Sequence, residues 1–256
     1  MAGHQDGAGK AAVKEAEAAE LMHMLRPERM NMLVDAVYAI VMTLLVLDLK
    51  VPEGLSPAEA LLRMQDLGPK ALAFVIGFIV TASGWAYVHQ VSGLFARSNL
   101  LHVGVNLLAL MFASLIPFSA SVMGAFPGAA YGPQIYALNI GLLTAIYGVD
   151  LLIGRASLIP PVVDRRLLFQ LIRNVFLAAA WYLVVALVIA PWSPIAALVF
   201  LGVHAVAHWV LLGTIERGLR KAARDVERWE AHHLNGADAA PVAARATRPH
   251  KRPTTA

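Results

Sequence analysis

DAVYAIVMTLLVLDLKVP, residues 35–52, is the stretch that decides the fold class. The twelve residues between its two aspartates are apolar or aromatic except for Thr43. A helix in a soluble core carries a polar face, which this run lacks. The run and the apolar residues before it reach the length of roughly 20 residues that crosses a bilayer. The stretch therefore predicts a membrane-spanning helix that carries a carboxylate, Asp35, near its start.

The composition extends this prediction to the whole chain. Of its 256 residues, 58% are hydrophobic and 15% are charged, whereas soluble domains carry about 25% charged residues. Charge is missing from several long blocks and concentrated between them, as in a polytopic membrane protein. The sequence contains no cysteine, which excludes disulfides and thiolate metal sites. The net charge of +4 fits basic cytoplasmic loops better than nucleic-acid binding.

Six segments are long and apolar enough to span a membrane, and short loops such as ARSN and PWSP join three of the pairs. We therefore predict an all-α fold with six transmembrane helices. Their predicted ranges are 31–49, 70–94, 99–121, 132–153, 168–190 and 194–214.

The basic residues predict the orientation. With a cytoplasmic N-terminus, 18 of the 21 Lys and Arg residues fall on the cytoplasmic side, and only Lys50, Arg63 and Lys70 fall outside. The positive-inside rule then places both termini in the cytoplasm.

Four regions follow from the charge pattern. Residues 1–28 form a cytoplasmic N-terminal segment, and 29–214 form the six-helix domain. Residues 215–235 read as a charged cytoplasmic helix, and 236–256 as a disordered basic tail. The loop between the first two spans contains a predicted short amphipathic helix that starts at Ser56.

The first span has two distinct faces. At 100° per residue, Asp35 lies roughly 120° from a stripe of small and apolar side chains with one hydroxyl. We therefore expect the carboxylate to face a neighbouring helix of the bundle. The stripe consists of Ala36, Ile40, Thr43 and Leu47, with Leu44 on its flank.

Partners for Asp35 are expected on the next two spans. Trp85 and His89 are four residues apart and share a helix face, and Asn106 lies on the third span. With Arg29 they make a candidate polar network. Such groups lock helices together at about 1 kcal/mol each, and that interpretation is favoured over direct chemistry.

Two other polar features carry less information. His204 and His208 have the i, i+4 spacing of metal ligands, but a zinc site needs three or four ligands, so packing is favoured and no metal is predicted. Asp150 is expected near the cytoplasmic membrane boundary. No phosphate-binding loop, nucleophile elbow or dinucleotide motif is present, so we predict neither an enzyme nor a cofactor.

Residues 29–120 resemble the transmembrane-protein-175 family of potassium channels. Arg29, Asp35, Ala39–Ile40 and the run Thr43–Asp48 match the motif of that family's first helix. Further matches are the Trp85 and His89 pair, Asn106, and the sequence IPF that ends at Phe118. The chain departs from the family at Leu33 and Val34, which replace a Phe-Ser pair.

The resemblance implies a homotetramer whose first helices line a central pore permeable to K⁺. By this resemblance the constriction comprises Ile40, Thr43 and Leu47, with Leu44 beside them and Ala36 at the cytoplasmic end. The chain has no TVGYG segment, so a filter of backbone carbonyls is not expected. The expected partners are the lipid bilayer, monovalent cations and three further copies of the chain.

Two alternatives stay open. A proton-coupled transporter could use Asp35, His89 and His208 as a relay, although no internal repeat typical of such carriers is evident. The other alternative is a non-conducting structural membrane protein.

Overall fold

The computed structural model describes residues 27–50, residues 67–233 and, between them, residues 54, 56, 59 and 64. The predicted tail and nearly all of the predicted N-terminal segment lie outside these residues. In the loop after the first span, the side chain of Glu59 accepts hydrogen bonds from the Ser56 hydroxyl at 2.6 Å and from its N–H at 3.0 Å. This is the capping box of a helix start, at the position expected from the sequence. These bonds lower the pKa of the Glu59 carboxyl.

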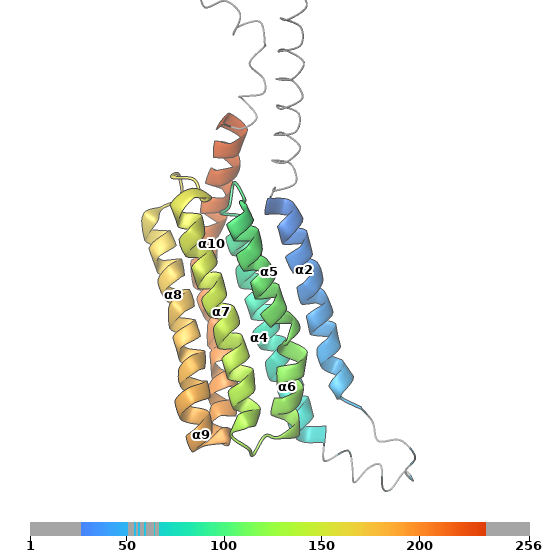
Figure 1. Cartoon of the computed structure of the whole chain (residues 1–256). Coiled ribbons are helices and arrows are strands. Elements are labelled where there is room, and N and C mark those ends of the chain that lie inside the picture. The colour runs from blue at the N-terminus through green and yellow to red at the C-terminus, as the bar shows by residue number, and fades with distance from the viewer. Residues whose placement is uncertain are drawn as a thin grey trace, which may run out of the picture.

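The described residues form an all-α bundle with six helices, or pairs of helices, long and apolar enough to cross a membrane. This confirms the predicted fold class and number of spans (Figure 1). The elements are α2 (Pro27–Leu44) with the 3₁₀ turn η1 (Leu45–Asp48), α4 (Gly68–Ser92), α5 (Leu100–Ser114), α6 (Ile116–Ala125), α7 (Tyr131–Ser157), α8 (Arg165–Val184), the π-helical turn η3 (Val185–Ile189), α9 (Ala190–Trp192) and α10 (Pro194–His233).

Two spans are interrupted where proline removes a backbone donor. The third span breaks at Leu115 into α5 and α6, because Pro117 cannot donate to the carbonyl of Ala113. In the fifth span the π turn η3 lies just before Pro191. Both are recognised causes of helix breaks and kinks, and both leave the spans long enough to cross a bilayer.

The sixth span and the charged segment after it are one continuous helix, α10. The charged part packs through Leu219, Ala222 and Val226, which are buried in a cluster with Phe95 and Leu168. The Arg97 guanidinium lies 5.9 Å from the centre of the Trp229 ring. The charged extension is therefore tied to the end of the bundle.

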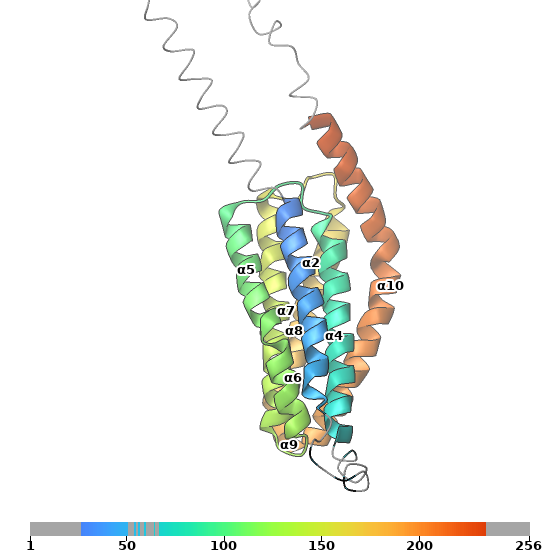
Figure 2. The same ribbon diagram turned by 90° about the vertical axis from the view of Figure 1, so that its right-hand side faces the viewer.

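The position of α2 determines what it can contact. It packs against α4 and α5, whereas α7 lies against α5, α6 and α8 in the middle of the bundle. Figures 1 and 2 both show α2 on the outside of the bundle, roughly parallel to its neighbours. One face of α2 is therefore available to lipid or to another subunit.

Close approach of α7 and α8 depends on Gly148, which gives a first prediction. A Cβ there would lie 2.7 Å from Cγ1 of Val175 and 2.9 Å from Cζ of Phe176. We expect Gly148→Ala to lower the free energy of unfolding by about 1–3 kcal/mol, because a packed interface must open to admit the methyl group. SDS titration in mixed micelles measures the change. Gly104→Ala on α5 is the matched control, since nothing lies within 4 Å of a Cβ there, and an equal loss in both variants would contradict the packing argument.

Candidate functional site

The two faces of α2 differ sharply in burial. Val34, Tyr38, Val41 and Leu45 are buried against the rest of the chain. The opposite face is exposed, with Ile40 at 56% and Leu47 at 61% of their maximal surface. All five residues of the stripe predicted from the sequence lie on this exposed face: Ala36, Ile40, Thr43, Leu44 and Leu47.

The 3₁₀ turn changes the geometry at the end of the stripe. Side chains at i and i+3 eclipse in a 3₁₀ helix, so Leu47 follows Leu44 along the axis and not Ile40, as a regular α-helix would predict. One turn earlier, the Thr43 hydroxyl donates to the Ile40 carbonyl at 2.8 Å. Its hydrogen is thereby used within the helix, and its oxygen lone pairs are left for an outside group.

Asp35 contacts α4 through two aromatic side chains. The Trp85 indole Nε1 donates to Asp35 Oδ1 at 2.8 Å, and His89 Nδ1 lies 3.8 Å from the same oxygen. The Trp85 and His89 rings stack with their centres 5.1 Å apart. The Asp35 and His89 side chains are 45% and 58% exposed, so this cluster joins α2 to α4 but keeps an open side.

The other two residues grouped with Asp35 from the sequence lie apart from it. Arg29 is exposed two turns earlier on α2, and no bond to Asp35 is found among the described residues. Asn106 is buried on α5, where its amide Nδ2 donates to the His102 carbonyl at 3.0 Å. The structure thus brings together three of the five predicted network residues.

A buried His–Asp pair lies beside Asn106 and was missed by the sequence reasoning. His102 on α5 and Asp150 on α7 approach to 2.7 Å between Nδ1 and Oδ1, and both are nearly inaccessible. The His102 ring stacks on Phe95 at 4.6 Å. Asp150, which the sequence predicts near the cytoplasmic boundary of the membrane, is buried within the bundle.

The geometry assigns the donor in this pair. The Asn106 amide also lies 3.3 Å from His102 Nδ1, but that nitrogen cannot accept a bond while it donates to the carboxylate. The shorter distance to Asp150 identifies Nδ1–H as the donor, and the Asn106 amide is satisfied by the His102 carbonyl. The three residues therefore tie α5 to α7.

A second contact across the bundle joins α2 to α7. The Tyr38 and Tyr147 hydroxyls lie 3.1 Å apart, and Tyr38 is almost completely buried. The only sequence signal was an aromatic residue in an aliphatic run. With the Asp35 contact to α4, this bond fixes which face of α2 turns outward.

His204 and His208 stack on one face of α10 with ring centres 6.1 Å apart. His204 also packs edge-on against Tyr182 at 4.8 Å. No group of three or more His, Asp or Glu side chains that could hold a metal ion occurs among the described residues. Aromatic packing therefore accounts for both histidines, as the sequence favoured.

The first half of the chain matches known potassium channels in sequence. The family model for the endosomal/lysosomal potassium channel TMEM175 matches residues 29–117. A potassium channel of Streptomyces collinus is 33% identical over 92 residues, which are 36% of this chain and 45% of that protein. A potassium channel of Chamaesiphon minutus is 31% identical over 117 residues, 44% of this chain and 56% of the relative. The chain thus matches about half the length of these relatives.

The fold likeness reaches further along the chain. The crystal structure of a lysosomal potassium-selective channel TMEM175 homologue from Chamaesiphon minutus superposes with a TM-score of 0.64. The superposition covers 72% of this chain and 96% of the homologue, at 21% sequence identity. The superposed part of this chain is more than twice as long as the segment 29–117. The shared fold therefore includes spans beyond the first three.

The six apolar helices and the shared fold define a multi-pass membrane protein built like a bacterial channel subunit. More particularly, residues 29–117 match the TMEM175 potassium-channel family in sequence, and the bundle as a whole shares the fold of a six-helix bacterial homologue. The resemblance found in the sequence is thereby confirmed.

Proposed function

We propose that the protein is a potassium-permeable cation channel in which four copies of α2 line a central pore. The observation that carries this proposal is the exposed stripe of α2, opposite the face buried in its own bundle. The stripe lies within the segment that matches the TMEM175 family. In this arrangement the constriction consists of Ile40, Thr43, Leu44 and Leu47, with Ala36 towards the cytoplasm.

The chemistry of the stripe favours a cation over an anion. The free lone pairs of Thr43 can replace part of the water around a cation, since the hydroxyl hydrogen is held by the Ile40 carbonyl. Asp48, at the end of η1, accepts one bond from Ser121 at 2.9 Å through Oδ1, and its other oxygen has no hydrogen-bond partner in the part of the chain that the structure describes. Four carboxylates at the mouth of a pore attract cations.

The apolar side chains supply the gate in this proposal. Ions must shed part of their hydration at a ring of Ile40 side chains, and a narrow apolar ring also closes by dewetting. Leu44 and Leu47 would form further apolar rings nearer Asp48, because the 3₁₀ turn places these two side chains one above the other along the helix axis. Selectivity then depends on ring diameter and on Thr43.

The polar contacts of α2 hold the lining helix in place. Asp35 binds Trp85 and adjoins His89, and Tyr38 meets Tyr147. These contacts limit rotation of α2, so the stripe stays on the axis. We propose that residues 29–214 form the channel domain in a bacterial inner membrane and that both termini lie in the cytoplasm. In this orientation Arg29 lies at the cytoplasmic end of α2.

Reconstitution tests the proposal. We expect purified protein in phospholipid vesicles to conduct K⁺ down an imposed gradient, and chemical crosslinking in mild detergent to give a tetramer. Flux that saturates with substrate and requires a proton gradient would instead support a carrier. A stable tetramer without flux would support a structural protein, and a strictly monomeric protein would exclude a pore on a fourfold axis.

A further inference from the structure

Helices α8 and α10 meet near two points and leave a cleft between them, which leads into a cavity of about 330 Å³. Near one point a Cβ on Gly218 would lie 3.5 Å from Leu167 Cδ1. Near the other, the Trp181 ring stacks on the His204 ring with their centres 5.9 Å apart. The cavity is separate from the exposed stripe of α2.

The mouth of the cleft opens on the bilayer. Leu177 on α8 and Leu211 on α10 line the cavity, yet they are 61% and 39% exposed. The small side chains of Ala178 and Ala207 also line it and leave room between the two helices. All four residues lie within candidate membrane spans, so the molecules that reach the mouth are lipids.

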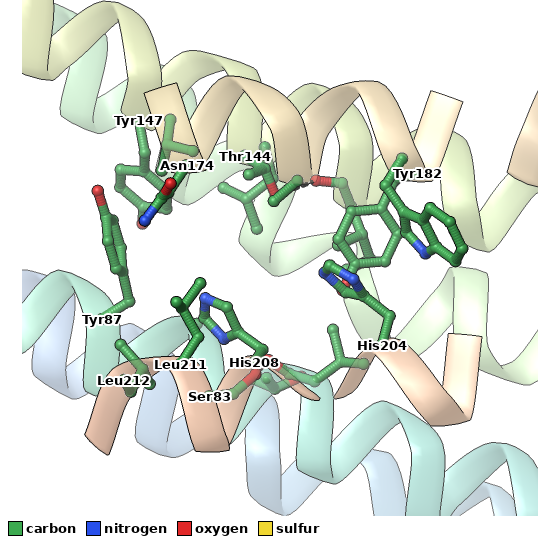
Figure 3. Close-up of a pocket in the computed structure, with 18 of the residues that line it drawn as sticks. Ser83, Tyr87, Thr144, Tyr147, Asn174, Tyr182, His204, His208, Leu211 and Leu212 are labelled. Carbon is green, nitrogen blue, oxygen red and sulfur yellow. Dashed lines mark hydrogen bonds between the residues drawn. The ribbon is translucent and has the colours of Figure 1, made fainter. Parts of the chain in front are cut away.

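The interior of the cavity is mainly apolar. The described lining residues include no Lys, Arg, Asp or Glu, and most are aliphatic or aromatic. Figure 3 shows Asn174 at one end, with Tyr87 and Tyr147 near it, and His204 and Tyr182 towards the other end. A charged group inside would lose its hydration without a counter-charge. The volume is at the small end of the range for ligand sites, so the interior suits one acyl chain and not a whole lipid.

A guanidinium group lies beside the Asn174 end of the cavity. Arg173 is exposed on α8, and its Nη2 donates to the Asn174 side-chain oxygen at 3.4 Å. It precedes Leu177 by four residues and therefore shares the face of α8 that carries the mouth of the cleft. No carboxylate forms an ion pair with Arg173 among the described residues. Its charge is therefore available to an anion outside the chain.

The length of the fifth span places Arg173 at the level of the lipid headgroups. The span Arg165–Trp192 has 28 residues, about eight more than a bilayer core requires. Its polar and basic side chains are concentrated in the first part, from Arg165 to Asn174, and the rest is apolar or aromatic up to Trp192. The extra length therefore lies at the start of the span, and a long arginine side chain there extends to the headgroups.

We propose that the cleft between α8 and α10 binds an anionic phospholipid, with one acyl chain inside the cavity and the phosphate on the Arg173 guanidinium. The planar guanidinium matches two phosphate oxygens at once, and the apolar lining receives the chain. The lipid thereby fills the space that the two helices leave open. The site is independent of conduction through the pore, and its test needs no ion flux.

Lipid binding to the full-length protein in mild detergent, after removal of the lipid that copurifies, tests both parts of the site. Dioleoylphosphatidylglycerol is the probe, and native mass spectrometry measures saturable binding of a single lipid per subunit. Dioleoylglycerol has the same chains without the phosphate and should bind about tenfold more weakly, because it lacks the charge-assisted contact. Glycerol 3-phosphate has the phosphate without the chains and should not compete.

Two arginine variants test the phosphate contact. Arg173→Gln should weaken phosphatidylglycerol binding about tenfold and leave dioleoylglycerol binding unchanged. Arg165→Gln is the matched control, since Arg165 is exposed on the same helix and does not adjoin the cavity, and it should leave both affinities unchanged. Equal losses in the two variants would mean that the lipid binds the basic surface in general, which contradicts the proposal.

A second pair of variants tests the place of the chain. Ala178 lines the cavity, whereas Ala180 on the same helix is exposed and does not. Ala178→Phe should abolish saturable binding and Ala180→Phe should not. If Ala178→Phe fails to fold, Ala207→Phe on the exposed side of α10 fills the mouth instead. Equal binding of the two wild-type probes, binding that survives the filling variant, or the absence of saturable binding would each overturn the proposal.

Discussion

Vesicles that contain the Ile40→Asn variant should take up K⁺ about tenfold faster than wild-type vesicles. In the proposed pore, four Ile40 side chains form an apolar ring that an ion crosses with part of its water removed. Moving a polar group into such surroundings without a partner costs about 0.5–2 kcal/mol even on mild scales. Amide oxygens on the ring would return much of that energy, and each 1.4 kcal/mol removed from the barrier raises the rate tenfold.

The same substitution should also reduce discrimination between ions. Asparagine carbonyls coordinate Na⁺ as readily as K⁺ and keep the ring wet, so we expect the K⁺ to Na⁺ flux ratio to approach one. The ratio is obtained by measuring the K⁺ and Na⁺ fluxes of the same vesicles with the two ion gradients imposed in opposite directions. The effect rests on the proposed pore, because a lipid-facing Ile40 would instead make the variant less stable and no more permeable.

Val199→Asn is the matched control for this experiment. Val199 lies on α10 with 60% exposure, close to the 56% of Ile40, and the exchange of an apolar side chain for an amide is similar. It should leave the K⁺ flux unchanged. Equal flux in Ile40→Asn and wild type, or equal gains in both variants, would remove Ile40 from the permeation path.

Local sequence patterns were sufficient for the fold class and for the faces of the first helix. The length and apolarity of each span depend only on neighbouring residues, and these features predicted six helices. The period of 3.6 residues placed Ile40 and Thr43 on one side of α2 and Asp35 away from them. The Trp85 and His89 pair, one turn apart, was recognisable for the same reason.

Contacts between distant helices could not be predicted in this way. His102 and Asp150 are 48 residues apart, and Tyr38 and Tyr147 are 109 apart. Their pairing depends on which helices become neighbours, and a single sequence does not encode that in any local period. Asn106 is grouped with Asp35 in the sequence because it is a polar residue on a neighbouring span, whereas helix packing places it beside His102. The change from α-helix to 3₁₀ turn at Leu45 likewise has no local signal.

The His102 and Asp150 pair gives the second large effect. We expect His102→Leu to lower the free energy of unfolding by about 3 kcal/mol, because it leaves a buried carboxylate without its donor. A carboxylate left alone in the bundle is an unpaired buried charge, whereas an imidazole has an uncharged form. Asp150→Leu should therefore cost less, about 1 kcal/mol, because the neutral imidazole that remains loses a single hydrogen bond.

The double variant His102→Leu/Asp150→Leu distinguishes a coupled pair from two independent sites. Replacing both partners of a buried ion pair with apolar residues is often neutral, so the double variant should unfold within about 1 kcal/mol of wild type. SDS titration of all four proteins closes the thermodynamic cycle and gives the coupling energy. Simple addition of the two single losses would contradict the pairing. Hydrogen bonds between membrane helices average only about 0.6 kcal/mol. A coupling energy well above that value would indicate that the pair carries charge. The loss in His102→Leu would then come from the unpaired carboxylate and not from the missing hydrogen bond.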